Sequence, residues 1–239
     1  MIGLEWRPPA FRPGQFVMLR VSDGLDPLLR RPFGIYKVMA ADAGVELLYQ
    51  VVGKGTRILS MKRPGESLGL LGPLGNGFPV PATGAKVVMV AGGMGIVPLY
   101  PFARDMKGGV LLYGTRGSIE ASVAGDFKQL DCKVKHATED GSIGVKGYVT
   151  ALLKAELTTD AVVYACGPAP MLKAVAAMAA SAGVRCYVSL ERSMACGIGV
   201  CLGCAVKGRP HADAGNKLYK MVCSDGPVFD GDDIDWEAF

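Results

Sequence analysis

The apolar residues of this chain follow two patterns, and the change between them lies near residue 85. Before it, short runs such as FVMLRV (16–21) and VELLYQVV (45–52) are separated by Pro and Gly, which predicts short strands. From Lys86 onward, apolar strand-like runs alternate with helix-length segments. The first part therefore predicts a small antiparallel β-barrel, and the second a parallel sheet with helices on both faces.

Strands and helices alternate regularly between residues 86 and 191. The predicted strands are KVVMVAGG (86–93), VLLYG (110–114), CKVKHA (132–137), DAVVYACG (160–167) and RCYVSLE (185–191), and the predicted helices cover about 96–106, a region before Cys132, 148–156 and 170–182. After Glu191 the alternation ends in a loop rich in Cys and Gly, followed by short strands at 205–207 and 218–223.

These patterns divide the chain into three predicted parts. We expect a β-barrel domain over residues 1–82, an α/β parallel-sheet domain over 83–190 and a small C-terminal module over 191–239. No low-complexity linker separates them, so they should pack closely together.

Glycine is strongly enriched, at 33 of 239 residues, about twice its usual share of roughly 7%. The glycines gather in GKG (53–55), GPLGNG (72–77), GGMG (92–95) and CGIGVCLGC (196–204), between well-patterned apolar runs. This placement favours tight turns around ligands over disorder.

Charge and hydropathy exclude several classes of function. The net charge of +4 is spread along the chain without a basic block, so a nucleic-acid partner is not expected. No run of eighteen uncharged apolar residues and no signal-peptide pattern is present, which predicts a cytoplasmic protein without a membrane segment. We also expect no acid–base catalytic residue, because the chain has two histidines and no apparent nucleophile–base grouping.

The cysteine spacing is the most specific feature of the sequence. Cys196, Cys201, Cys204 and a distant Cys223 match the C-x4-C-x2-C…C spacing of plant-type 2Fe-2S proteins. The intervening glycines let the backbone turn sharply, so that its N–H groups can approach the sulfurs. A zinc site is the alternative, although zinc sites usually combine two C-x2-C pairs and this chain has one.

Two Gly-rich turns predict a dinucleotide site. Gly92, Gly93 and Gly95 follow one predicted strand and begin a helix, and Cys166 and Gly167 occupy the same place after another strand. Ligands of open α/β sheets bind at the carboxyl ends of the strands, and a pyrophosphate can lie against a helix N-terminus there. Taken singly, each turn is also compatible with an ordinary strand-to-helix connection, and the cysteines at 132, 166 and 186 with buried core residues.

These motifs resemble the ferredoxin-NADP reductase superfamily. GGMGIVP followed by CGPAPM is similar to its pyridine-nucleotide half, which implies that Cys166 lies near the nicotinamide. RRPFGIY is similar to its flavin motif of Arg, two residues and Ser or Thr, which assigns FAD contacts to Arg31, Pro32, Phe33 and Gly34, with Arg31 on a phosphate. Gly34 departs from that motif, because it offers no hydroxyl to the reactive edge of the flavin.

The GKGT string resembles the superfamily's pyrophosphate turn. This implies that Gly53, Gly55 and Thr56 donate to the phosphates of FAD, whereas the alternative is an ordinary helix cap by Thr56.

A narrower resemblance covers nearly the whole chain. Eight ordered strings are similar to the electron-transfer subunits of class B, NAD-dependent dihydroorotate dehydrogenases: PGQFVML, RRPF, VVGKGT, GPLGNGF, AGGMGIVP, CGP, SLERSMACGIGVCLGC and VCSDGPVF. The resemblance implies FAD, a 2Fe-2S cluster and NAD as cofactors and NADH as electron donor. It also implies an FMN-containing catalytic subunit as partner in a hetero-oligomer, a heterotetramer, of pyrimidine biosynthesis.

The resemblance leaves some features open. The family usually has a further strand before the PGQF string, and this chain begins close to that string, so the first barrel strand is expected to be absent, supplied differently or lost to a misassigned start. Thr115 and Arg116 after the second strand leave the choice between NADH and NADPH undecided. Related subunits for NAD(P)H-dependent ferredoxin or sulfide-linked reduction, a redox sensor with a vestigial nucleotide site and a zinc-stapled subunit remain alternatives.

Overall fold

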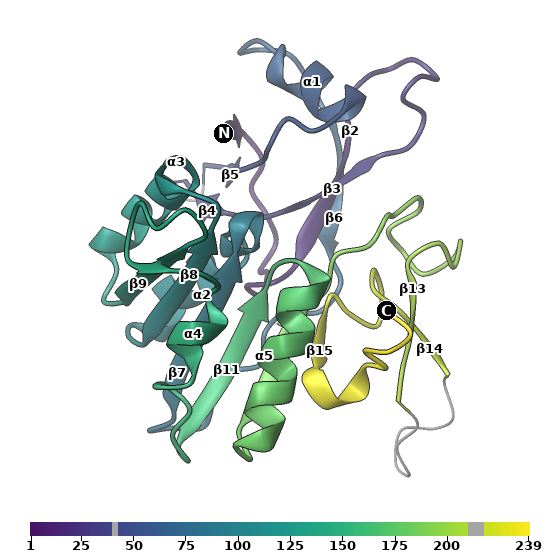
Figure 1. Cartoon of the computed structure of the whole chain (residues 1–239). Coiled ribbons are helices and arrows are strands. Elements are labelled where there is room, and N and C mark those ends of the chain that lie inside the picture. The colour runs from purple at the N-terminus through teal and green to yellow at the C-terminus, as the bar shows by residue number, and fades with distance from the viewer. Residues whose placement is uncertain (40–42, 210–217) are drawn as a thin grey trace.

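The computed structural model describes residues 1–39, 43–209 and 218–239. It combines an N-terminal β-barrel, a large mostly parallel sheet with helices on both faces and a small C-terminal module (Figure 1). The predicted fold class is therefore confirmed. The boundaries at 82/83 and 190/191 stay predictions.

The barrel consists of two three-stranded antiparallel sheets around one apolar core. The first has the order β1 (Ile2–Leu4), β5 (Val45–Leu47), β4 (Lys37–Val38), and the second the order β3 (Arg31–Gly34), β2 (Phe16–Arg20), β6 (Gly69–Leu74). The helix α1 (Lys54–Ser60) contributes the buried Leu59 to this core. Since β1 pairs with β5, a strand does precede the PGQF string.

The large sheet places two strand-to-helix turns at its centre. Its order is β10 (Val145–Lys146), β9 (Lys133–Thr138), β8 (Val110–Thr115), β7 (Lys86–Gly92), β11 (Ala161–Cys166), β12 (Arg185–Ser189), β15 (Val228–Asp230). After β7 the chain proceeds outward through β8 and β9 to β10, then returns to the other side of β7 at β11. The boundary between β7 and β11 is therefore the topological switch point, where ligands of such sheets bind.

Both faces of this sheet are covered, which explains why its central strands β7, β8 and β11 are largely apolar. On one face, Val88, Val90 and Val163 pack against α4 (Thr150–Leu153) and α5 (Ala169–Ser181). On the other face, Met89 packs with residues of α2 (Leu99–Met106) and η3 (Ser122–Gln129), the latter following the short α3 (Ser118–Ala121). The 3-10 turn η2 (Gly93–Ile96) leads from β7 toward α2.

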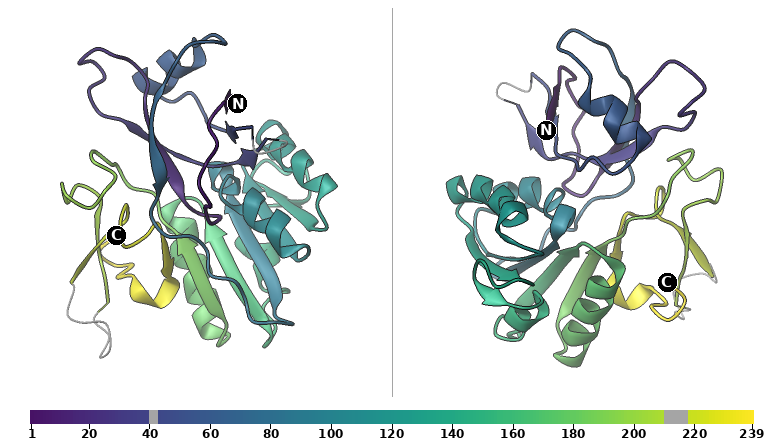
Figure 2. Two further views of the ribbon diagram at one scale, coloured as in Figure 1. Left: turned by 180° about the vertical axis from the view of Figure 1, so that it is seen from behind. Right: turned by 45° about the horizontal axis from the view of Figure 1, so that its top comes forward.

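The C-terminal module joins the rest of the molecule through its own strands. The strands β13 (Ala205–Lys207) and β14 (Tyr219–Met221) pair with each other, while β15 pairs antiparallel with β12 at the edge of the large sheet and leads into η4 (Gly231–Asp233). Both views of Figure 2 show the module, light green to yellow, below the barrel and beside the large sheet. None of the helices in the described part of the chain has the length and apolarity of a membrane span.

A buried carboxylate ties three segments of the large sheet together, away from its carboxyl ends. Glu156 is 8% exposed, and its carboxylate accepts from Lys135 at 2.6 Å and pairs with Lys86 at 2.9 Å. The hydrogen bonds from Lys135 and then Lys86 hold the pKa of Glu156 below its usual range. This carboxylate therefore stabilises the fold at neutral pH, and the contribution is lost as the pH falls through its depressed folded-state pKa.

We expect Glu156→Gln to lower the free energy of unfolding at pH 7 by about 1–3 kcal/mol, because both lysines lose their charged partner. Urea unfolding at several pH values measures this difference, which should shrink under acidic conditions where the wild-type carboxyl is itself protonated. Glu66→Gln, which breaks the exposed ion pair of Glu66 with Lys62 at 2.9 Å, is the control and should change little. A difference that stays constant down to acidic pH would contradict this interpretation.

Candidate functional site

The four cysteines of the C-terminal module converge as two pairs. The sulfurs of Cys204 and Cys223 lie 3.3 Å apart, and both residues are buried, each 2% exposed. The other pair is nearer the surface, where the backbone N–H of Cys201 donates to the sulfur of Cys196 at 3.4 Å. Cys204 and Cys223 are 19 positions apart in the chain. They are brought together because the backbone N–H of Val222 donates to the carbonyl of Cys204.

Backbone N–H groups point at these sulfurs. Gly199 donates to the sulfur of Cys223 at 3.1 Å, Ile198 to that of Cys196 at 3.5 Å, and Cys223 to that of Cys204 at 3.4 Å. The turn that allows this has left-handed backbone at Gly197 (φ 76°) and Gly199 (φ 83°), a conformation that glycine adopts readily.

One thiol of each pair has a shifted pKa, and the two shifts have opposite directions. Hydrogen bonds from the backbone N–H groups of Ile198 and Cys201 lower the pKa of the Cys196 thiol to about 6. Burial and the neighbouring Cys204 raise the pKa of Cys223 to about 12. Metal coordination would deprotonate the buried Cys223 thiol outright, so Cys196 supplies a ready thiolate whereas Cys223 ionises with binding.

The paired arrangement distinguishes between the two metal alternatives. A structural zinc site gathers four ligands around one ion, whereas a 2Fe-2S cluster has two irons, each held by two thiolates. Two thiol pairs with N–H groups aimed at the sulfurs therefore fit the two-iron cluster better than zinc.

The predicted flavin residues come together on the barrel. Arg31, Pro32, Phe33 and Gly34 form β3, and the side chain of Arg31 crosses Gly55, so that its Nε lies 2.9 Å from where a Cβ on Gly55 would be. The guanidinium is steadied by donating to the backbone carbonyl of Leu29. Arg31 therefore stands beside the GKGT turn, the arrangement that a phosphate bound by both would need.

Thr56 organises the GKGT turn. Its hydroxyl oxygen accepts from the backbone N–H groups of Val52 at 3.0 Å and Gly53 at 3.1 Å, and it donates to the carbonyl of Gly53. The hydroxyl thus takes part in a capping box at the start of α1, in which Gly53, and not Thr56, is the N-cap residue. The assignment of Gly53, Gly55 and Thr56 to the phosphates of FAD stays a prediction.

Gly34 lies where the barrel meets the large sheet. A Cβ at this position would lie 3.1 Å from the Cγ1 of Val97, which follows η2. A serine or threonine there would therefore need Val97 to shift. The missing hydroxyl at Gly34 thus coincides with a close approach of the barrel to the nucleotide turn.

The two nucleotide turns interlock at the switch point. A Cβ on Gly95 would lie 2.0 Å from the carbonyl oxygen of Cys166, and one on Gly92 would lie 2.6 Å from the sulfur of Met171. Gly167 has left-handed backbone (φ 155°) and faces Gly92 in turn, whereas Gly93 (φ 51°) has open space beside it. The structure therefore brings the predicted glycines of both turns together, with Gly93 nearest to solvent.

Cys166 is buried beneath this junction rather than exposed within it. Its side chain is 2% exposed, and burial raises the pKa of its thiol strongly. Ser189, its parallel neighbour on β12, is also buried. The thiol is thus a buried, neutral group at the carboxyl end of β11, and its role at the nicotinamide stays a prediction.

The loop after β8 is lined by carboxylates. The backbone N–H of Arg116 donates to the Glu120 carboxylate at 3.0 Å, and the side chain of Asp140 occupies the space beside Gly117, 2.5 Å from where its Cβ would be. Thr115 is buried, and its hydroxyl donates to the carbonyl of Gly117. The carboxylates of Glu120 and Asp140 therefore lie beside Arg116 and reduce the positive charge that this loop offers to a 2′-phosphate.

Comparison with known proteins agrees with this arrangement. Residues 191–235 match the iron-sulfur cluster binding domain of dihydroorotate dehydrogenase B, and residues 89–177 match the oxidoreductase NAD-binding domain. The dihydroorotate dehydrogenase B (NAD(+)) electron transfer subunit of Desulforamulus reducens is 43% identical over 231 residues, which are 94% of this chain and 87% of that protein. The chain belongs to this family of electron transfer subunits.

Other members of the family give the same result. The electron transfer subunit of Caldanaerobacter subterraneus is 40% identical over 96% of this chain and 90% of its own length.

Solved structures show the same fold. A chain of the NADH-dependent reduced ferredoxin-NADP oxidoreductase, described in connection with flavin-based electron bifurcation, superimposes with a TM-score of 0.80. It is 31% identical over 95% of this chain and 80% of its own. The ferredoxin reductase of carbazole 1,9a-dioxygenase gives a TM-score of 0.62 at 26% identity over 74% of this chain and 58% of its own.

Some residues near the switch point and at the boundary between the barrel and the large sheet were not singled out from the sequence. Ser189 ends β12 at the same edge of the sheet as Cys166, and Glu191 follows two residues later. The protein around Glu191 raises the pKa of its carboxyl. The rule that ligands bind at carboxyl ends of strands could have pointed to both, because the SLE string closes a predicted strand. No sequence pattern pointed to Tyr36. Its hydroxyl nevertheless donates at 2.8 Å to Asp126 of η3, across the boundary between the barrel and the large sheet.

Proposed function

We propose that this chain transfers electrons between NADH and the FMN of a dihydroorotate dehydrogenase catalytic subunit, through FAD on the barrel and a 2Fe-2S cluster on Cys196, Cys201, Cys204 and Cys223. The observation that carries the proposal is the continuity of the three sites. The nucleotide turn reaches Gly34 of the flavin motif through Val97, and the cysteine loop reaches the barrel through Gly197, which contacts Met18. This continuity and the family membership together support electron transfer in preference to a structural or sensor role.

The bound groups would supply the redox chemistry, since a flavin exchanges a hydride, two electrons and a proton, with NADH or NAD⁺ and single electrons with an iron-sulfur cluster. The chain's own residues would bind and orient these groups. Arg31 and the GKGT turn would hold the phosphates of FAD, and the turns at Gly92–Gly95 and Cys166–Gly167 would hold the nucleotide at the switch point. None of these steps needs a protein acid or base.

The outer edge of the cysteine loop suits contact with a partner. Ile198, Val200 and Leu202 are 54%, 74% and 64% exposed, although all three are apolar and lie between the cluster cysteines. A catalytic subunit docked there would bury apolar surface and shield the cluster from solvent. We propose accordingly that the chain works in a cytoplasmic hetero-oligomer, a heterotetramer, of pyrimidine biosynthesis.

Anaerobic addition of NADH to the purified chain tests this function. We expect the yellow flavin absorbance to bleach and a reduced 2Fe-2S signal to appear by electron paramagnetic resonance. NADPH should act at least tenfold more slowly at equal concentration, because carboxylates face the loop after β8. Bleaching without any cluster signal would refute the proposed relay, and a preparation without FAD would instead favour a sensor with a vestigial nucleotide site.

The similarity to NADH-dependent reduced ferredoxin-NADP oxidoreductase supports a second candidate. In that case the electron acceptor would be a ferredoxin-linked partner and not a dihydroorotate-oxidising subunit. Purifying the native complex and identifying its second chain separates the two candidates. Reduction of the complex by dihydroorotate is expected only for the first.

A further inference from the structure

One turn of the barrel is joined to the cluster-bearing segment by a single asparagine. Asn76 lies just after β6, in the string GPLGNG, and its backbone N–H donates to the carbonyl of Gly226 at 2.6 Å. Its side-chain amide donates to the carbonyls of Asp225 at 3.1 Å and Val228 at 2.8 Å, and its side-chain oxygen accepts from the N–H of Val228 at 2.9 Å. The amide therefore uses both its donor and its acceptor on a segment about 150 residues away.

The segment held by Asn76 connects the cluster to the large sheet. It begins just after Cys223, a predicted cluster ligand, and ends in β15, which pairs with β12. The turn is braced from the barrel side, because the side chain of Gln15 donates to the carbonyl of Gly75 at 2.7 Å. Gly75 also leaves the space that the carbonyl of Gly226 needs, since a Cβ there would lie 2.6 Å from that oxygen.

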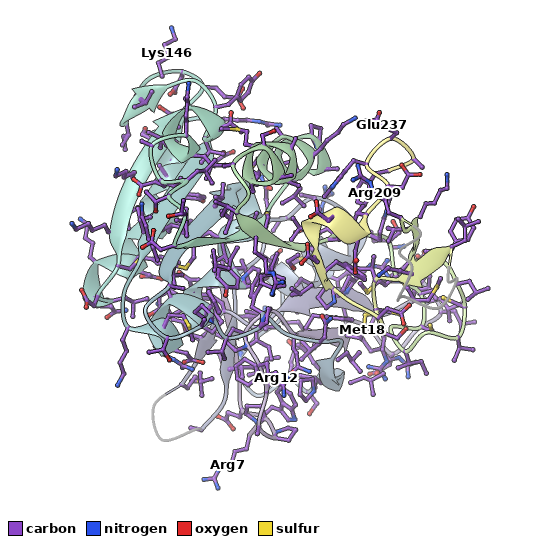
Figure 3. All side chains as sticks on the ribbon, turned by 90° about the horizontal axis from the view of Figure 1, so that it is seen from below. Arg7, Arg12, Met18, Lys146, Arg209 and Glu237 are labelled. Carbon is purple, nitrogen blue, oxygen red and sulfur yellow. The ribbon has the colours of Figure 1, made fainter. Side chains whose placement is uncertain are left out.

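A second contact joins the cluster loop to the flavin strand. Met18 on β2 is fully buried and pairs in register with Pro32 of the flavin motif. The Cγ of Met18 lies 2.7 Å from where a Cβ of Gly197 would be, so the loop between Cys196 and Cys201 rests directly on β2. Figure 3 labels Met18 on the side of the barrel that faces the C-terminal module.

We propose that Asn76 is a positioning residue that fixes the distance between the flavin and the cluster. The proposal rests on the function proposed above, because it concerns the two groups assigned there. Met18 and Gly197 set how closely the cluster loop can approach the barrel, and Asn76 prevents the segment behind Cys223 from moving away. Electron transfer slows steeply with distance, so small displacements of the cluster reduce its rate strongly.

The position of Asn76 implies that its loss should affect only one of the two electron-transfer steps. Asn76 is exposed at the surface and contacts neither nucleotide turn, so its side chain is not part of the core that holds the NADH site. Losing it should therefore slow the step between flavin and cluster and leave the step between NADH and flavin unchanged. A residue that only stabilised the fold would not separate the two steps.

The test uses the FAD- and cluster-loaded chain in anaerobic stopped-flow mixing with NADH. For Asn76→Ala we expect flavin bleaching within about twofold of wild type and cluster reduction slowed by about tenfold or more, at unchanged iron content. Asn76→Asp keeps an acceptor for the N–H of Val228 and should fall in between. Glu66→Gln, on the same barrel, should match wild type in both steps.

Amide hydrogen exchange gives a readout independent of turnover. In Asn76→Ala the N–H of Val228 loses its acceptor and should exchange faster, while amides of the core strand β7 should exchange as in wild type. Unchanged exchange at Val228 would overturn the proposal.

The other outcomes of the stopped-flow experiment and the iron content also decide whether the proposal holds. Cluster reduction at the wild-type rate in iron-replete Asn76→Ala, or equal slowing of both steps, would overturn the positioning role. If Asn76→Ala loses its iron, Asn76→Asp becomes the deciding variant, and loss of iron from both would show that the turn assembles the cluster and does not position it. Failure of wild type to reduce its cluster with NADH would instead refute the proposed function.

Discussion

Replacing Gly95 by alanine is expected to abolish reduction by NADH and to lower the free energy of unfolding by about 3 kcal/mol. The new Cβ would lie 2.0 Å from the carbonyl oxygen and 2.3 Å from the carbonyl carbon of Cys166. Both are backbone atoms at the end of β11, a central strand, so they cannot rotate away as a side chain would. Chemical unfolding measures the stability change, and anaerobic NADH titration measures the loss of flavin bleaching.

Gly125→Ala is the matched control in the same part of the molecule. A Cβ at Gly125 would meet no heavy atom within 4 Å, and the backbone there is outside the left-handed region. This variant should keep wild-type stability and reactivity. Gly95→Ala should also retain FAD, because the flavin residues lie on the barrel, and dithionite should still bleach it. If the two variants behaved alike, the close approach of the two turns would be wrong.

The features that depend only on neighbouring residues were the ones that the sequence predicted best. The helix expected over 170–182 is α5 (Ala169–Ser181), and the strand expected over 110–114 is β8, because their apolar periodicity is set by local geometry. The spacing of Cys196, Cys201 and Cys204 is also a local feature, since the three residues lie within nine positions of the chain, and it predicted a cluster loop. The expected helix over 148–156 is only the single turn α4, because the chain turns after Leu153 toward β11.

Contacts between distant segments were not predictable in this way. The strand expected over 45–52 ends at Leu47, where the backbone instead leads into the turn before Gly53. No local pattern indicates that Val228 begins a strand on the edge of the large sheet, or that Asn76 bonds to that segment. The left-handed backbone of Leu202 (φ 60°) is likewise set by wrapping the cysteine loop and not by any preference of leucine.

Cys201→Ser is expected to remove the cluster while leaving FAD in place. Cys201 is the exposed member of the outer pair, and its backbone N–H already serves the sulfur of Cys196. A serine hydroxyl is a much poorer ligand for iron than a thiolate, so the loop would lose one of four ligands. Iron should fall from about two per chain toward zero, and the reduced-cluster signal should disappear.

The control for this variant is Cys132→Ser, which removes a thiol from a half-buried position outside the cysteine loop and should leave iron content unchanged. Cys201→Ser should still be bleached by NADH, because Arg31 and both nucleotide turns are untouched and Cys201 is solvent-exposed. Retention of full iron would exclude Cys201 as a ligand. Loss of FAD together with iron would show that the cysteine loop, through Gly197 and Met18, holds the flavin barrel in shape and does not merely rest on it.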